Sequence, residues 1–311
     1  MSFTSIVKNE ISKLEIEKTD AIAELSAIVI NSELTLNKIK FQTENSSVAR
    51  RVYSLFKNIF NIQPKITIRK GYNYNKNMIY FIEINYEIIK ILEELALYKS
   101  NKILPVPIEY IIDDMETMRA YLRGIFLSVG SVNDPKKSRY HLEFLFESER
   151  YADFVSYILN EFYLNSKVIK RENKYMVYIK EAEKIGDFLR IVNASNAVMY
   201  YEDIRIYRDH KNMTNRLNNM EQANVDKIIA NADKQTNDIN IIIENGGLDL
   251  LDEKEQIIAK YRLKYPDASL LELSEIISYE TGKTISKSGV NHRMNKIKVL
   301  AKKLKDFEEG K

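Results

Sequence analysis

The feature that most constrains the fold is a long internal repeat. Residues 20–100 and 116–195 share one order of apolar patterns: a helix, a strand, a second helix, a hairpin of two strands and a third helix. Leu25 and Leu122 stand at matching points of the two copies. Solenoids repeat every 20 to 50 residues or so, and this repeat is much longer. The sequence therefore predicts one pseudo-symmetric α+β domain built from two similar halves.

Within each half, the spacing of apolar residues indicates the type of element. The helix over 45–62 is predicted to have Ser46 or Ser47 as its N-cap, and Gly71 with the two residues after it predicts a hairpin turn. In the first half, the predicted elements are helix 20–33, strand 37–44, helix 45–62, strands 64–71 and 77–86, and helix 87–98. In the second half they are helix 115–130, strand 139–148, helix 149–163, hairpin 166–180 and helix 181–192.

The first helix of each half carries small residues four positions apart. These are Ala23 and Ala27 in one helix, and Gly124 and Ser128 in the other. Small side chains at this spacing let two helix backbones approach closely, so we expect these helices to form the central seam of the domain. In this pattern the sequence resembles the LAGLIDADG homing endonucleases. In that family two such helices pack together, and each places one acid beside the scissile DNA phosphate.

The acids of that family are missing from this sequence. The eighth motif position is Ser32 in the first helix and Val129 in the second. Metal-assisted hydrolysis needs hard oxygen ligands for Mg²⁺, and neither residue supplies a carboxylate. Glu33 comes one position late, about 100° around a helix. Ser32 and Val129 are therefore interpreted as lost catalytic positions, which predicts no catalytic residue, no metal and no cofactor in this domain.

After residue 208 the composition changes. Residues 209–250 are rich in asparagine, with isoleucines at helical spacing, and predict a polar helical linker. Gly246 and Gly247 suit its C-cap. The first domain is thus expected to span residues 1–208, and a second, all-helical domain to span 251–311.

The last segment predicts three short helices. The first is stopped by Pro266, and the second opens with Ser269 and Glu272, spaced as a capping box. The third helix begins at Ser286 or Ser288. Helices in this order, with Gly282 in the turn between the last two, predict a helix-turn-helix.

The residues of the third helix divide into an apolar face and a polar remainder. On a helical wheel Val290, Met294, Ile297, Ala301 and Leu304 fall on one face, which is expected to be the core face. The polar types elsewhere suit DNA, because asparagine can pair with adenine edges and lysine or arginine with guanine or phosphate. The predicted DNA contacts are Ser286, Lys287, Ser288, Asn291, His292, Arg293, Asn295, Lys296 and Lys303.

Charge and composition agree with this interpretation. From Thr281 to the end of the chain nine residues are basic and three acidic, although the net charge of the whole protein is only +3. A basic terminal block beside a near-neutral body is typical of a polyanion-binding module. The chain has no cysteine and three scattered histidines, which disfavours disulfides and zinc sites. Without a signal pattern or a long apolar run, a cytoplasmic, nucleoid-associated protein is expected.

The order of these parts resembles one bacterial family. A degenerate LAGLIDADG-like domain, a polar helix and a C-terminal helix-turn-helix are the arrangement of the WhiA family of sporulation and cell-division regulators. The resemblance is carried by "YLRGIFLSVGSVNDPKKSRYHLEF", "NRLNNMEQANVDKIIANADKQTNDI" and "RLKYPDASLLELSEII". It implies a terminal domain similar to region 4 of sigma factors, double-stranded DNA as partner, and RNA polymerase, a sigma factor or another transcription regulator as possible protein partners. No small molecule and no membrane are implied.

The sequence is compatible with three functions. The first is a sequence-specific DNA-binding transcription regulator. The second is a scaffold whose large domain senses a ligand or a protein and whose terminal helices dock a partner. The third is a residual metal-dependent nuclease that uses displaced acids such as Glu24 or Glu33.

Overall fold

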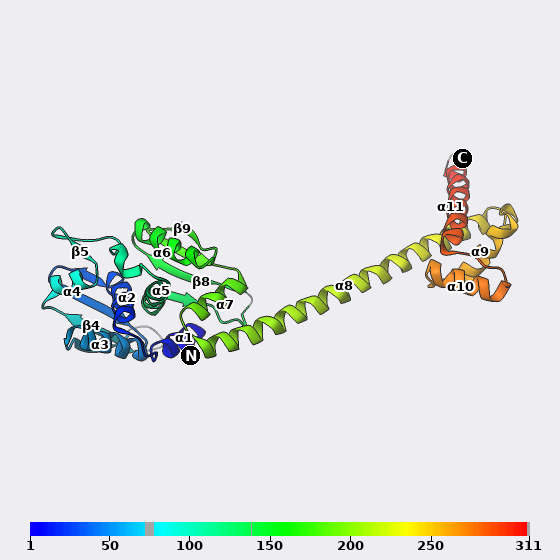
Figure 1. Cartoon of the computed structure of the whole chain (residues 1–311). Helices are drawn as coiled ribbons and strands as arrows, with labels where there is room; N and C mark the ends of the chain where they lie inside the picture. Colours follow the sequence, from blue (N-terminus) through cyan, green and yellow to red (C-terminus); the bar gives the residue numbers. More distant parts are fainter. Residues whose placement is uncertain (72–77, 138, 310–311) are drawn as a thin grey trace. The chain divides into compact units, whose positions relative to one another are not determined.

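The chain divides into two compact units, which are described separately. The computed structural model describes residues 1–71, 78–137 and 139–309. The first unit is Met1–Asp209 and the second is His210–Lys311 (Figure 1). The predicted turn after Gly71 falls partly outside the described residues.

The first unit consists of two similar α+β halves. Each half has a four-stranded sheet, with the order β1-β2-β4-β3 in one and β7-β8-β10-β9 in the other, and all neighbouring strands are antiparallel. The identical order confirms the predicted repeat and the α+β fold class. The helices are α1 (Phe3–Ile11), α2 (Lys18–Ile30), α3 (Ser46–Phe60), α4 (Ile88–Glu94), α5 (Met115–Val129), α6 (Glu149–Glu161) and α7 (Ala182–Ile191), with a 3₁₀ turn η1 (Glu109–Ile112). The strands are β1 (Glu33–Thr35), β2 (Lys38–Thr43), β3 (Lys65–Lys70), β4 (Met78–Ile84), β7 (Gly130–Val132), β8 (Leu142–Phe146), β9 (Lys167–Arg171) and β10 (Lys174–Ile179), and a separate small hairpin consists of β5 (Tyr98–Lys99) and β6 (Lys102–Ile103).

The two central helices, α2 and α5, pack against each other so closely that glycine is required at the crossing. A Cβ atom added to Gly124 would lie 2.2 Å from the carbonyl oxygen of Glu24 and 2.8 Å from Ala27 Cβ, and real Cβ atoms are not found at such distances. Leu25 and Leu122, the matching residues of the repeat, are both fully buried. The predicted central seam is therefore confirmed.

Some local features differ from the sequence predictions. The N-cap of α3 is Asn45, whose Oδ1 accepts hydrogen bonds from Ser47 N at 2.8 Å and Val48 N at 3.1 Å. The predicted caps, Ser46 and Ser47, lie inside the helix. Asparagine caps as well as serine, so the residue type alone did not separate the three candidates. Helix α1 and the short strands β1 and β7 were not predicted.

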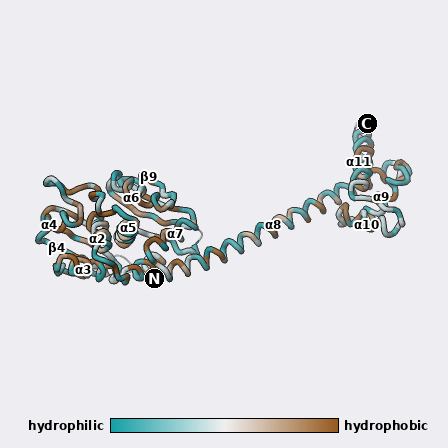
Figure 2. Tube along the Cα trace, viewed as in Figure 1, coloured by the Kyte–Doolittle hydropathy of each residue, from teal (hydrophilic) through white to brown (hydrophobic). Residues whose placement is uncertain are grey.

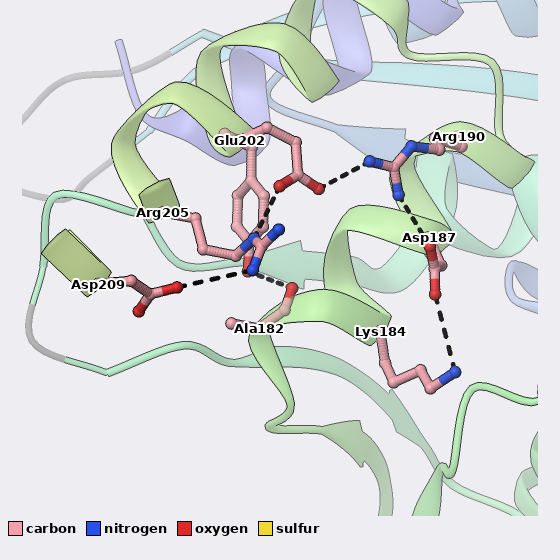
Figure 3. A network of polar contacts seen from close by, with 8 residues as sticks. Ala182, Lys184, Asp187, Arg190, Glu202, Arg205 and Asp209 are labelled. Carbon is pink, nitrogen blue, oxygen red and sulfur yellow. Dashed lines mark hydrogen bonds and ion pairs between the residues drawn. The ribbon is translucent and has the colours of Figure 1, made fainter. Parts of the chain in front are cut away.

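The first unit ends in a helix that starts earlier than predicted. Helix α8 spans Ser195–Glu244, whereas the sequence placed the start of the linker helix after residue 208. Glu202 of α8 accepts hydrogen bonds from Arg190 of α7 (2.8 Å) and from Arg205 (2.7 Å), and Tyr201 OH donates one to Ala182 O (2.9 Å). Figure 3 shows this network extending from Lys184 to Asp209. The first turns of α8 are thus fixed to α7 within the first unit.

The second unit groups the rest of α8 with the terminal helices. It contains η2 (Leu248–Leu250), α9 (Glu253–Lys264), α10 (Leu270–Thr281) and α11 (Lys287–Glu309). Ile239 and Ile242 of α8 are buried in the same apolar cluster as Val290 and Ile297 of α11. Residues that the sequence assigned to a linker therefore supply part of this core.

Helix α8 is otherwise polar. Figure 2 shows it as mostly hydrophilic, with single hydrophobic positions. After its last turn Gly246 and Gly247 have φ angles of +146° and +85°. Both are positive, as glycine allows, but they lie outside the left-handed helical basin that is typical of a glycine C-cap, since the ψ of Gly247 is 174°. Among the described residues, no helix combines the length and apolar content needed to cross a membrane.

Candidate nucleic-acid interface

Helices α10 and α11 form a helix-turn-helix in which both starts are capped. Ser269 Oγ accepts a hydrogen bond from Glu272 N (3.2 Å), and the Glu272 carboxylate accepts one from Ser269 N (2.7 Å), which confirms the predicted capping box. The bond from the Ser269 backbone holds the pKa of Glu272 below its ordinary value. Gly282 in the turn has a φ of +67°, which glycine adopts without strain. At the start of α11, Ser286 Oγ accepts a bond from Gly289 N (3.2 Å).

Helix α11 buries one face and exposes the remainder. Val290, Met294, Ile297 and Ala301 are at most 3% exposed, and Leu304 packs against the same cluster, so the predicted core face is confirmed. The nine predicted DNA contacts lie outside this face. Arg293 is half-buried, and the others are exposed: Ser286, Lys287, Ser288, Asn291, His292, Asn295, Lys296 and Lys303.

These nine residues do not have one common environment. Lys287, Asn291 and Asn295 line a cavity of about 610 Å³ together with residues of α8, α9 and α10. The N-terminal half of α11 is therefore exposed to this cavity, and α8 forms part of the cavity wall. The sequence interpretation placed α8 in a linker and did not expect it beside the candidate reading helix.

Lys296 is held by acids of its own unit. Its Nζ lies 3.3 Å from Glu255 Oε1 and 3.9 Å from Asp252 Oδ2, both at the start of α9. Hydrogen bonding from the Glu255 backbone N–H lowers the pKa of Asp252, and Lys296 lowers it further. The wheel had grouped Lys296 with residues that face away from the core, which is correct, but the wheel could not show that the neighbouring helix pairs with it.

Two basic residues at this surface were not singled out from the sequence. Lys298 of α11 and Lys234 of α8 line the same cavity as Lys287. Lys298 falls on the flank of the wheel, and Lys234 belongs to the segment interpreted as a linker. The only sequence signal for either was its place in a positively charged or polar run.

In the first unit, the two lost catalytic positions lie at one cavity. Ser32 and Val129 line a space of about 770 Å³ at the C-terminal ends of α2 and α5. Ser32 Oγ donates a hydrogen bond to Ile28 O at 2.8 Å, and valine has no ligand atom. Glu33, at the same cavity, lies 3.3 Å from Lys40. Within the described ranges, no group of three or more His, Cys, Asp or Glu side chains could hold a metal ion.

The other acid considered for a displaced metal site, Glu24, is already bound by two arginines. It is fully buried. Its Oε1 accepts a hydrogen bond from Arg51 Nε (2.7 Å), and its Oε2 accepts one from Arg123 Nε (2.6 Å). Both carboxylate oxygens are therefore engaged in ion pairs, and Glu24 contributes to the seam rather than to an open site.

Matches to known protein families cover almost the whole chain. Residues 18–98 match the WhiA N-terminal LAGLIDADG-like domain, residues 118–211 the WhiA LAGLIDADG-like domain, and residues 214–301 the WhiA C-terminal HTH domain. A relative from Staphylococcus carnosus, named probable cell division protein WhiA, is 42% identical over 99% of both chains.

Two solved structures show the same fold. Full-length DUF199/WhiA from Thermatoga maritima has a TM-score of 0.59 and 23% identity, and covers 97% of this chain and 99% of its own. The N-terminal LAGLIDADG domain of DUF199/WhiA has a TM-score of 0.51 and 23% identity, and covers 61% of this chain and 90% of its own. The matched HTH domain supports DNA binding and a regulatory rather than an enzymatic role. On these matches, the chain belongs to the WhiA family.

Proposed function

We propose that this protein is a sequence-specific transcription regulator that reads duplex DNA with α11. The observation that carries the proposal is the exposed surface of α11, which has no acidic residue from Lys287 to Lys305 and follows a capped α10 in a helix-turn-helix. In this motif the second helix enters the major groove with its N-terminal residues against the bases.

The side chains of α11 suggest two roles along its length. Ser288, Asn291 and His292 come first, and their hydrogen-bonding groups suit base edges. Lys303 comes about three to four turns later and suits a phosphate, as does Lys302 beside it. Lys296, held by Glu255, is expected to contribute less than its charge alone would suggest.

We propose further that the first unit has no nuclease activity. The two positions that should carry metal ligands are Ser32 and Val129, and Glu24 is neutralised by Arg51 and Arg123. Incubating supercoiled plasmid with the protein and Mg²⁺ or Mn²⁺ should yield no nicked or linear product. Cleavage that a Glu33→Ala variant abolishes would overturn this part of the proposal.

The genes under control are proposed to be those of cell division, chromosome segregation or sporulation, since the relatives are named cell division proteins. Acting on the nucleoid in the cytoplasm, such a regulator could contact RNA polymerase, a sigma factor or another transcription regulator.

The test of DNA binding is a titration of fluorescent duplex with the full chain at several salt concentrations. Binding should weaken steeply with salt. A Lys287→Ala and Arg293→Ala double variant should lose at least tenfold in affinity, on the order expected for two charged contacts. The matched control removes two charges from α9, Lys254→Ala with Lys260→Ala, and should retain affinity. Equal affinities for the two double variants would contradict the assignment.

A second candidate is a scaffold that senses a ligand through the first unit. The observation in its favour is the cavity at the ends of α2 and α5, where Asn31 and Tyr151 lie beside apolar residues. A DNA titration would separate the two functions, because a scaffold would show no preference among duplex sequences.

A further inference from the structure

A nearly buried arginine in the second unit lacks a complete set of partners. Arg262 of α9 is 1% exposed. Its Nη1 donates hydrogen bonds to the carbonyl oxygens of Tyr265 (3.3 Å), Pro266 (3.2 Å) and Ala268 (2.6 Å). Its Nε is buried and has no acceptor. Leaving a buried donor unpaired costs about 1–3 kcal/mol, so the side chain of Arg262 has an unmet capacity to donate.

Arg262 also has no carboxylate partner. None of the described ion pairs includes it, and burial lowers its pKa. The three carbonyl oxygens account for Nη1 and for the connection between α9 and α10, which is a structural role. They do not supply a negative charge, and a buried cation normally has one nearby.

Arg262 lines a cavity that is rich in cations. Arg262 lines the 610 Å³ space between α8, α10 and α11, together with Lys234, Lys287 and Lys298. The single acid in its lining is Asp238, whose pKa is raised by burial, an effect that Lys298 opposes. Four basic groups against one acid favour an anion.

Groups that donate hydrogen bonds to anions complete the lining. Leu270 and Leu271 at the start of α10 line the cavity, and the first N–H groups of a helix have no acceptor within the helix. Ser269 also lines it, but its N–H donates to the Glu272 carboxylate. Gln235 Oε1 is buried without a partner, and a rotated amide would present N–H instead. Asn291 and Asn295 of α11 add two more amides.

We propose that this cavity binds a phosphate group. A phosphate would supply the negative charge that the four basic lining residues lack. Because α11 forms one wall, the source that fits is the DNA backbone beside the bases that α11 reads, with Lys234 of α8 as an additional contact. This source rests on the proposed function. A free phosphate or a phosphorylated small molecule has the same chemistry.

The first arm of the test measures how salt weakens DNA binding by the full chain. A Lys234→Gln variant loses one cavity lysine, and Lys227→Gln removes the same charge from α8 outside the cavity. Losing one phosphate contact reduces the slope of log K against log salt by about 0.9, equivalent to about tenfold in affinity near 0.1 M salt. We expect this reduction in Lys234→Gln and not in Lys227→Gln. Lys298→Gln provides a second cavity variant.

The second arm uses inorganic phosphate without DNA. At constant ionic strength, replacing chloride by phosphate should raise the Tm of the wild type more than that of Lys234→Gln if the site takes free phosphate. Any general stabilisation by phosphate appears equally in Lys227→Gln and is subtracted. A changed slope identifies the DNA backbone as the source, and a changed Tm response identifies a free phosphate group.

The inference is overturned if Lys234→Gln and Lys298→Gln behave like Lys227→Gln in both arms. Failure of the proposed function would look different. In that case the chain would bind no duplex at all, and the phosphate arm alone would decide whether the cavity is an anion site.

Discussion

Arg123 Nε lies 2.6 Å from Glu24 Oε2 across the seam between α5 and α2. Both side chains are at most 2% exposed, and Arg51 binds the other carboxylate oxygen. The seam is therefore held by a buried ion cluster in addition to close backbone contact. A carboxylate bound on both sides in this way is a structural group, and its removal should affect folding.

Glu24→Gln should destabilise the first unit strongly. Removing one partner of a buried ion pair leaves an uncompensated charge, which typically costs about 3–5 kcal/mol. Thermal unfolding in a scanning calorimeter measures the loss of unfolding free energy. Glu33→Gln is the control, because the Glu33 side chain is 60% exposed and its pair with Lys40 should contribute less than about 1 kcal/mol. Equal losses in the two variants would show that the cluster does not stabilise the seam.

Gly124→Ala should be costlier than Gly186→Ala, although both glycines lie inside helices. At position 124 the added Cβ would meet the Glu24 backbone at 2.2 Å, whereas at 186 it would meet Glu202 Oε1, the end of a flexible side chain, at 2.4 Å. We expect about 1–3 kcal/mol or more for the first and less than about 1 kcal/mol for the second, where alanine also gains helix propensity. Calorimetry that ranks them in reverse order would contradict the close seam.

Two lysines of α11 should differ in their effect on DNA affinity. Lys287 lines the cavity beside α8, whereas Lys296 is 3.3 Å from Glu255. Breaking an ion pair offsets part of what a lysine would gain from a phosphate, so Lys287→Ala should weaken binding several-fold more than Lys296→Ala. Anisotropy titrations at one salt concentration measure the difference. A larger loss for Lys296→Ala would mean that DNA displaces the acids of α9.

Stability should rise with pH above pH 8 because of Lys8. Burial lowers the pKa of Lys8 to about 8, despite the Phe126 ring 5.7 Å from its Nζ, which favours the charged form. In an unfolded chain the lysine pKa is about 10.4. Between these values the unfolded state binds more protons, so the free energy of unfolding increases as pH rises. From pH 7.5 to pH 9.5, the free energy of unfolding of the wild type should rise relative to that of Lys8→Met. An equal change in both proteins would contradict this prediction.

The sequence predicted the features that depend on periodicity. Alternating and helical apolar patterns identified the repeat, and their spacing placed Leu25 and Leu122 in equivalent buried positions. The small residues around Gly124 predicted the seam because backbone approach depends on side-chain size. The capping box of Ser269 was visible because both of its partners lie three residues apart.

Contacts between residues far apart in the sequence leave no local pattern from which to predict them. Arg51 and Arg123 meet Glu24 from two different helices, and no local pattern connects the three. Likewise, the polar surface of α8 gave no sign that Lys234 would line the same cavity as Lys298. An apolar stripe as narrow as that of α8 is typical of a linker helix, and only the fold shows that part of it completes the core of the second unit.

The most direct measurement of the central claim is selection from a pool of randomised duplexes by the full chain. The wild type should enrich one sequence motif. A variant with Asn291→Ala and His292→Ala should still bind DNA, because the basic residues remain, but should enrich a different motif or none. If the wild type enriches nothing, or if the variant enriches the same motif, α11 does not read the sequence.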